Sequence, residues 1–202
     1  YLFALVAGDL IFDKETFTTL SGKLVTIKIF HNREHFGKVK HALICIKKAM
    51  AWDEINYGRE YDLDVFNIVA VDDFNAGAME NKGLNIFNSK YILCDDETST
   101  DSDFVLTEAI IAHEYFHNWT GNRVTCRDWF QLCLKEGLTV FREQEYMEDQ
   151  LEKEISRINQ TDFLIKNQFK EDAGPLSHSA RPTKYLEINN FYTATVYEKS
   201  AE

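Results

Sequence analysis

The sequence predicts an α+β fold in which a sheet packs on a helical half. Two stretches in the first half have the composition of strands, residues 23–30 ("KLVTIKIF") and 66–74 ("FNIVAVDDF"). Beyond residue 100 the patterns are mainly those of helices, with apolar residues at intervals of three and four. Strands that are followed by a run of helices favour this fold class.

The first half is expected to contain three strands and one helix. Residues 2–7 and 23–30 have strand composition, and the second stretch alternates apolar and polar positions imperfectly. From about Glu34 to Trp52, apolar side chains recur at three and four residues, which predicts a helix. Residues 66–74 have the pattern of a short buried strand.

The second half begins with a polar and acidic stretch, residues 94–103, that is expected to form a loop. Asp101 or Ser102 could cap the helix that follows it. Two further helices are predicted at about 129–149 and 151–170. A loop is then predicted that contains Gly174, Pro175 and Pro182. No repeat or clear linker divides the chain, so one main domain is expected.

The composition argues against two classes of partner. The 202 residues carry a net charge of −11, and the lysines and arginines form no long cluster. Nucleic acid is therefore a poor candidate, whereas a cationic ligand suits the charge. No apolar run approaches the ~20 residues that a membrane span requires. We expect no nucleic-acid partner, no membrane span in this sequence and a cytoplasmic location.

The cysteines and most histidines show no pattern of a metal site. The cysteines lack CxxC spacing and the density of a secreted scaffold, and they are interpreted as reduced, mostly buried side chains: Cys45, Cys94, Cys126 and Cys133. Four isolated histidines lack partners at ligand spacing and are interpreted as surface or hydrogen-bonded residues: His31, His35, His41 and His178.

The stretch "HEYFHNW", residues 113–119, differs from these. On a helix, His113 and His117 are separated by about 40° around the axis and ~6 Å along it, so both imidazoles can reach one ion. Glu114 points away from that line but stays near it. Zinc fits two imidazoles, one carboxylate and an open position, where a bound water has a pKa of about 7. One zinc per chain is predicted.

The third ligand should be a carboxylate from another element, and Glu136 is the candidate. It lies inside the predicted second helix, among Cys133, Leu134 and Leu138, where a charge needs a partner. The adjacent Gly137 costs roughly 1 kcal/mol in a helix interior relative to alanine. That cost is easier to understand if another backbone passes close by, and the histidine helix is the expected neighbour.

These motifs resemble those of the gluzincin metallopeptidases. The resemblance rests on "HEYFHNW" followed by "LKEGLTVF", and "GAMEN" at residues 77–81 narrows it to the aminopeptidase N family, its bacterial members in particular. It extends over nearly the whole chain, through "VDDFNAGAMENKGLNIFN", "TGNRVTCRDWFQLCLKEGLTVFREQE" and "NNFYTATVYEK".

The resemblance implies a role for each of these residues. The zinc ligands of the family fall on His113, His117 and Glu136, and its general base falls on Glu114. Its transition-state tyrosine falls on Tyr197 of "VYEK". Its exopeptidase motif falls on five consecutive residues: Gly77, Ala78, Met79, Glu80 and Asn81.

The implied reaction removes N-terminal residues from peptides that have a free amine. A zinc-bound water, activated by Glu114, would attack the first carbonyl, and Tyr197 would help to stabilise the oxyanion. The small residues of "GAMEN" would let an extended peptide lie against a strand edge, with Glu80 facing the amine. Tyr192, five residues before Tyr197, would point a different way on a helix.

The resemblance also implies a domain arrangement. Residues 9–202 would form a thermolysin-like catalytic domain that is truncated at its C-terminus, and residues 1–8 would end a preceding β domain. An upstream β domain and downstream helical domains would be missing from this sequence. Two positions differ from the usual family pattern: Ser200 replaces the glycine after Tyr-Glu-Lys, and Ala76 stands where bacterial members usually have methionine.

Four other functions stay open. An endopeptidase would need a cleft that is open beyond the amine, and an epoxide-hydrolysing relative would use a similar zinc; inhibition by amine-bearing analogues would separate these readings. Another alternative is a module that holds zinc and binds peptides but no longer hydrolyses them. A purely structural zinc site has no need for Glu114, which is present.

Overall fold

The computed structural model describes residues 2–202, which form two compact units. The first unit ends at Asn118 and contains a mixed sheet with two long helices, and the second begins at Trp119 and is built mainly from helices. A mixed sheet that is followed by helices confirms the predicted α+β class.

Five strands form the sheet of the first unit. Their bounds are β1 (Ile11–Thr18), β2 (Leu24–His31), β3 (Val65–Val71), β4 (Ala78–Met79) and β5 (Leu84–Asn88). They are arranged in the order β1-β2-β3-β5-β4. The central strands β2, β3 and β5 are parallel, whereas β1 and β4 pair antiparallel at the two edges. Parallel neighbours need a crossover, which α1 (Lys40–Tyr57) supplies between β2 and β3.

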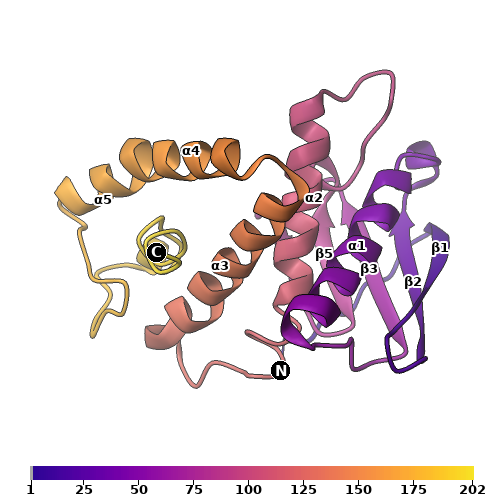
Figure 1. Ribbon diagram of the computed structural model, residues 1–202, viewed down its shortest axis with the longest axis horizontal. Coiled ribbons are helices and arrows are strands. Elements are labelled where there is room, and N and C mark those ends of the chain that lie inside the picture. Colours follow the sequence, from indigo (N-terminus) through magenta and orange to yellow (C-terminus); the bar gives the residue numbers. More distant parts are fainter. Residues whose placement is uncertain (1) are drawn as a thin grey trace. The chain divides into compact units, whose positions relative to one another are not determined.

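The core of this unit lies between the sheet and its two helices. α1 and α2 (Asp101–Phe116) lie side by side on one face of the sheet (Figure 1). Alternate residues of β2 are fully buried on one face, as the period of two predicts: Val25, Ile27 and Ile29. The predicted strands at 23–30 and 66–74 are therefore confirmed as β2 and β3.

The N-terminal segment differs from the prediction. Residues 2–7 form no strand, because no strand of the described chain pairs with them. Phe3 and Leu5 are each 85% exposed, and an extended segment without a neighbour has no sheet partners for its backbone groups. The first strand is instead β1, whose largely polar sequence does not reveal it. Residue 1 of the predicted preceding β domain lies outside the described residues.

The first helix begins later than predicted. Arg33–His35 form a short 3-10 helix, and Gly37 has a φ of 84°, which a right-handed helix cannot include. α1 therefore starts at Lys40 rather than near Glu34. It continues beyond Trp52 to Tyr57 and ends at Gly58, whose φ of 63° is typical of a C-cap.

The N-cap of α2 is Thr100 rather than Asp101 or Ser102. Asp103 N–H donates to Thr100 Oγ1 at 3.3 Å, and Thr100 N–H donates to Asp103 Oδ2 at 2.8 Å. This reciprocal pair is a capping box. The predicted caps are wrong by one or two positions because the helix already includes both residues.

The second unit is a series of helices. α3 (Leu132–Gln150) follows a 3-10 turn at Trp129–Gln131, and α4 (Lys153–Phe163) runs through a π-helical turn into α5 (Phe169–Ala173) (Figure 1). These elements confirm the predicted helices at 129–149 and 151–170 within a few residues. A loop follows at Gly174, as predicted.

No helix within residues 2–202 is both long enough and apolar enough to cross a membrane. The four cysteines are free thiols: Cys45 and Cys94 are buried, and Cys126 and Cys133 are partly exposed. His31 is fully buried, and its Nε2 lies 2.9 Å from Asp13 Oδ2. This contact confirms the interpretation of His31 as a hydrogen-bonded histidine.

Candidate functional site

The two histidines of "HEYFHNW" lie at the C-terminal end of α2. His113 is in the last turn and His117 is the C-cap, where its backbone stays helical with a φ of −58°. The Nε2 atoms of the two rings are 3.0 Å apart, and the ring planes are at 85° to each other. The predicted pairing of His113 and His117 is thus present in the structure.

This arrangement fits a zinc ion. Two nitrogens of a tetrahedral zinc site lie about 3.3 Å apart when each Zn–N bond is ~2.0–2.1 Å. The Nε2 separation of 3.0 Å is close to that value, and it is also the length of a hydrogen bond between the two rings. Glu114 is 8% exposed and His117 is 1% exposed, so the end of the helix is shielded from water. Glu114, which directly follows His113 in the sequence, is thus a buried carboxylate at this end of α2.

An aromatic cluster holds this end of α2. Phe116 packs against Trp52 of α1 with ring centroids 5.2 Å apart, and Tyr115 packs against Tyr61 and Phe66 at 6.1 and 6.0 Å. Because Tyr115 and Phe116 lie between the two histidines in sequence, their burial fixes which face of α2 carries the imidazoles.

The "GAMEN" residues form the edge of the sheet. Ala78 and Met79 are β4, which pairs with Phe87 and Ile86 of β5 and is an edge strand among the described residues. The next two residues of the motif, Glu80 and Asn81, are 3% and 7% exposed. An edge strand offers backbone groups to an extended peptide, as the sequence argument requires.

The residues around Gly77 leave room for a side chain at this position. A Cβ atom at this position would lie 3.8 Å from the ring of Tyr91, which is an ordinary contact. The backbone carbonyl of Gly77 accepts a hydrogen bond from the N–H of Asn88 at 2.9 Å. The structure of this unit therefore leaves room for a side chain, and the reason for glycine here is not found in the described contacts.

A polar network that sequence reasoning missed connects the two motifs. Lys82 directly follows "GAMEN", and its Nζ donates to Asp62 Oδ1 at 2.6 Å and to Asn118 Oδ1 at 2.5 Å. Asn118 directly follows His117, and its Nδ2 donates to Asp62 Oδ1 at 3.1 Å. The network ties the end of the edge strand to the end of the histidine helix. Adjacency to the motifs was the only sequence signal for it.

Glu136 lies in the second unit, on the buried face of α3. It is 3% exposed, and its Oε1 is 2.8 Å from Nζ of Lys135, which is itself 5% exposed. A buried carboxylate is costly unless it is paired, and Lys135 meets part of that need within the helix. The apolar residues that produced the helical pattern are about half-exposed: Leu134, Leu138 and Phe141.

The backbone that passes close to Gly137 is that of Ser200. A Cβ atom on Gly137 would lie 2.5 Å from Ser200 Cβ and 3.1 Å from its carbonyl carbon. The expectation of a close approach is therefore confirmed, and the nearest atoms belong to Ser200 rather than to the histidine helix. Glycine at 137 is needed because the C-terminal segment occupies the space of a side chain.

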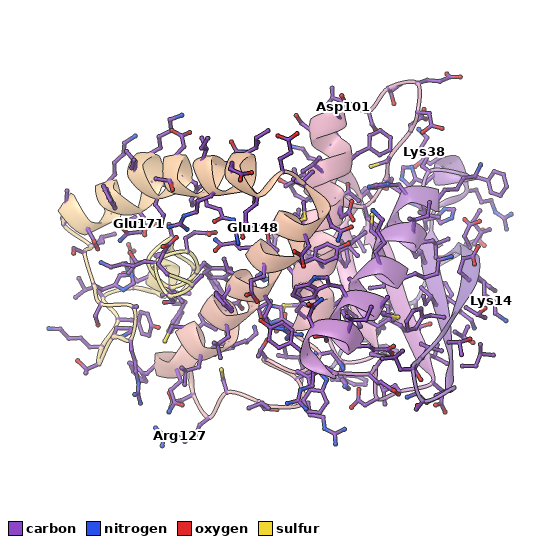
Figure 2. All side chains as sticks on the ribbon, viewed as in Figure 1. Lys14, Lys38, Asp101, Arg127, Glu148 and Glu171 are labelled. Atoms are coloured by element: carbon purple, nitrogen blue, oxygen red, sulfur yellow. The ribbon has the colours of Figure 1, made fainter. Side chains whose placement is uncertain are left out.

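Tyr197 also lies in the second unit, in a helical turn whose first N–H groups are bound by Glu171. Glu171 is labelled in Figure 2. The Glu171 carboxylate accepts hydrogen bonds from the N–H groups of Ala194 and Thr195 at 3.0 and 2.8 Å, and from Thr195 Oγ1 at 2.9 Å. Tyr197 N–H donates to Thr193 O at 3.0 Å within the same turn. A carboxylate at the start of a helical turn satisfies its free N–H groups.

The exposure of the two tyrosines differs. Tyr192 is 61% exposed, whereas Tyr197 is partly buried. The two therefore have different surroundings, and the different directions that the sequence predicts for them on a helix stay a prediction. Glu136 and Tyr197 belong to the second unit, whereas the histidine pair, Glu114 and "GAMEN" belong to the first.

Comparison with known proteins identifies the family. Residues 41–202 match the model of the peptidase family M1 domain. The chain belongs to peptidase family M1. Its resemblance to aminopeptidase N is also confirmed: it is 58% identical to aminopeptidase N of Haemophilus influenzae and 59% identical to that of Caulobacter vibrioides, over all 202 residues. The chain spans 23% of the length of each of these relatives.

A solved structure shows the same M1 fold. The chain superimposes on aminopeptidase A of Legionella pneumophila, crystallised in complex with aspartic acid, with a TM-score of 0.84 and 35% sequence identity. The match covers 96% of this chain and 22% of that protein. The region that matches the M1 family, residues 41–202, contains both motifs: "GAMEN" at residues 77–81 and "HEYFHNW" at residues 113–119.

Proposed function

We propose that the protein is a zinc-dependent aminopeptidase that removes N-terminal residues from peptides with a free amine. The observation that carries this proposal is the pair of imidazole nitrogens, 3.0 Å apart at the shielded end of α2, with Glu114 between them in sequence. Its membership in the M1 family and its identity to aminopeptidase N proteins support the same conclusion.

His113, His117 and Glu136 would hold the zinc. The two imidazoles come from α2 and the carboxylate from α3, which gives the three-ligand set of a catalytic zinc site. A bound zinc would supply Lewis acidity, which lowers the pKa of a water molecule toward 7 and polarises a carbonyl group. The contact with Lys135 would orient the Glu136 carboxylate.

Glu114 would act as the general base and acid. Its carboxylate would accept a proton from the attacking water and return it to the leaving nitrogen of the peptide. The hydroxyl of Tyr197 would donate a hydrogen bond to the carbonyl oxygen as negative charge develops there. The turn that Glu171 holds would keep Tyr197 in position.

The "GAMEN" residues would bind the substrate. The edge strand β4 would align the peptide backbone, and Glu80 would accept hydrogen bonds from the free α-ammonium group. The other residues of the motif would shape this subsite: Gly77, Ala78, Met79 and Asn81. The network of Lys82, Asp62 and Asn118 would hold the subsite in register with His117.

The domain boundaries and the cytoplasmic location stay predictions. We propose that residues 9–202 belong to a thermolysin-like catalytic domain, and that residues 1–8 end a preceding β domain. The activity of the whole protein would also depend on the parts that its relatives have outside the matched 23% of their length.

Elemental analysis tests the zinc site. The full-length protein, dialysed against low-zinc buffer, should retain one tightly bound zinc per chain. A double variant, His113→Ala with His117→Ala, should lose that zinc, whereas a control double variant, His35→Ala with His178→Ala, should keep it. Full zinc retention in the first variant would remove the basis of the proposal.

A further inference from the structure

Three other side chains of metal-binding type meet between α1 and α2. His41 and Cys45 come from α1 and Glu108 comes from α2. A nitrogen of His41, the sulfur of Cys45 and a carboxylate oxygen of Glu108 all lie within 4.8 Å of one another. Cys45 Sγ is 3.2 Å from His41 Nε2. None of these residues belongs to the proposed catalytic site.

The arrangement repeats the geometry of the histidine pair. His41 and Cys45 are four residues apart on one helix, as His113 and His117 are, so both donors can reach one ion. His41 is therefore not isolated: its interpretation from the sequence considered histidine partners and overlooked Cys45. The Cys45 residue is fully buried, the side chain of Glu108 is 12% exposed and His41 is only partly buried. An ion could therefore enter past His41 and reach a largely shielded donor set.

We propose that His41, Cys45 and Glu108 form a second binding site for zinc or a similar divalent cation, with water in the fourth position. One imidazole nitrogen, one thiolate and one carboxylate suit the borderline ions Zn²⁺, Co²⁺ and Cd²⁺. Ca²⁺ and Mg²⁺ would require more oxygen ligands than this cluster offers. A bound ion would link α1 to α2 five residues before His113.

Occupation of the site must displace existing contacts. His41 Nε2 lies 3.0 Å from the carbonyl oxygen of Phe104, and Lys48 Nζ lies 3.0 Å from Glu108 Oε1. Binding would require His41 to carry its proton on Nδ1 and Lys48 to release the carboxylate. Both contacts oppose binding, so the second site should fill only when the zinc concentration is raised.

Binding also releases a proton. Burial raises the pKa of the Cys45 thiol, and the neighbouring Glu108 carboxylate and Cys94 act in the same direction, whereas Lys48 opposes them. The thiol is protonated at neutral pH, so the S–H bond breaks as the sulfur–metal bond forms, and the proton passes to solvent.

Cobalt titration of the full-length protein provides the test. A thiolate that binds Co²⁺ gives a charge-transfer band in the near ultraviolet, and the proposed catalytic site contains no thiol. The band should therefore report the second site whether or not the catalytic proposal holds. Cys45→Ser should abolish the band and weaken binding at the second site by at least about tenfold. Cys94→Ser, which changes another buried thiol outside the donor set, should retain both.

A second pair of variants tests whether the ammonium group of Lys48 competes with the metal for Glu108. Neither variant removes a proposed ligand. Lys48→Gln should strengthen cobalt binding, because it removes the ammonium group that pairs with Glu108. Lys47→Gln makes the same charge change one residue away, where the partner is Glu15, and should have little effect. The absence of a band in the wild type, its persistence in Cys45→Ser, or equal effects of the two lysine variants would overturn the proposal.

Discussion

The two units hold their candidate site residues by different means. In the first, His113, His117 and Glu114 lie on a regular helix that a capping box begins and aromatic packing fixes. In the second, Glu136 is a buried charge that pairs with Lys135, and Tyr197 lies in a short turn that depends on Glu171. The first set lies on one regular helix, whereas in the second the turn of Tyr197 has no regular helix around it and depends on Glu171, 23 and 24 positions from the groups that it accepts from.

This difference predicts how variants should behave. Changes to the chemical groups of the first unit should alter turnover while the fold is kept, because the helix is held by other residues. Changes to the supports of the second unit should reduce stability and turnover together, because the same contacts hold the segment and position its side chains.

The largest effect is expected for Glu114→Gln in the first unit. The amide has the same shape but cannot accept a proton from water, so kcat should fall by about 10³-fold or more while zinc is retained. Steady-state kinetics and elemental analysis on the same sample measure both quantities. Near-native turnover would show that Glu114 is not the base. Loss of the zinc would show that it acts on metal binding instead.

Gly137→Ala tests the close approach in the second unit. The added Cβ would lie 2.5 Å from Ser200 Cβ, so the free energy of unfolding should fall by about 3 kcal/mol, at the upper end of overpacking effects. Adding Ser200→Gly should restore part of the loss, because it removes the nearest atom. A Gly137→Ala variant as stable as the wild type in urea unfolding would contradict the contact.

Glu171→Gln tests the support of the Tyr197 turn. The carboxylate accepts three hydrogen bonds, and weakening them should cost about 2 kcal/mol of stability and also lower kcat. The neighbouring variant Asp172→Asn weakens a half-exposed ion pair with Lys199 and serves as the control. Equal effects of the two variants on kcat would argue against a positioning role for Glu171.

The smallest effect is expected at the start of α2. Thr100→Ala removes one half of the capping box and should cost about 1 kcal/mol of stability, with kcat unchanged because the histidines lie at the other end of the helix. Thr98→Ala, an exposed position in the preceding loop, should have no effect. Thermal unfolding of the two variants measures the difference.

The same contrast explains what the sequence could predict. β2, β3 and the long helices follow from periodicity, and the pairing of His113 with His117 follows from spacing on a helix. β1 was missed because its sequence is largely polar, and residues 2–7 were predicted as a strand because composition does not reveal whether a neighbouring strand exists.

Long-range contacts account for the remaining differences. Gly137 indicated a close backbone, but nothing in the sequence identified Ser200 as that neighbour. The network of Lys82, Asp62 and Asn118 joins residues up to 56 positions apart, and the Glu171 contacts span 23 and 24 positions. Such pairs carry no periodic signal, so a single sequence does not reveal them.

The most direct test of the proposed function compares a free dipeptide substrate with its N-acetylated form. An ammonium group that enters a shielded pocket needs a fixed carboxylate, and such charged hydrogen bonds contribute roughly 1.5–3 kcal/mol. The full-length protein should therefore hydrolyse the acetylated substrate at least ~100-fold more slowly in kcat/KM. Glu80→Ala should reduce this discrimination by slowing the free substrate. Equal rates on the two substrates in the wild type would contradict the aminopeptidase proposal.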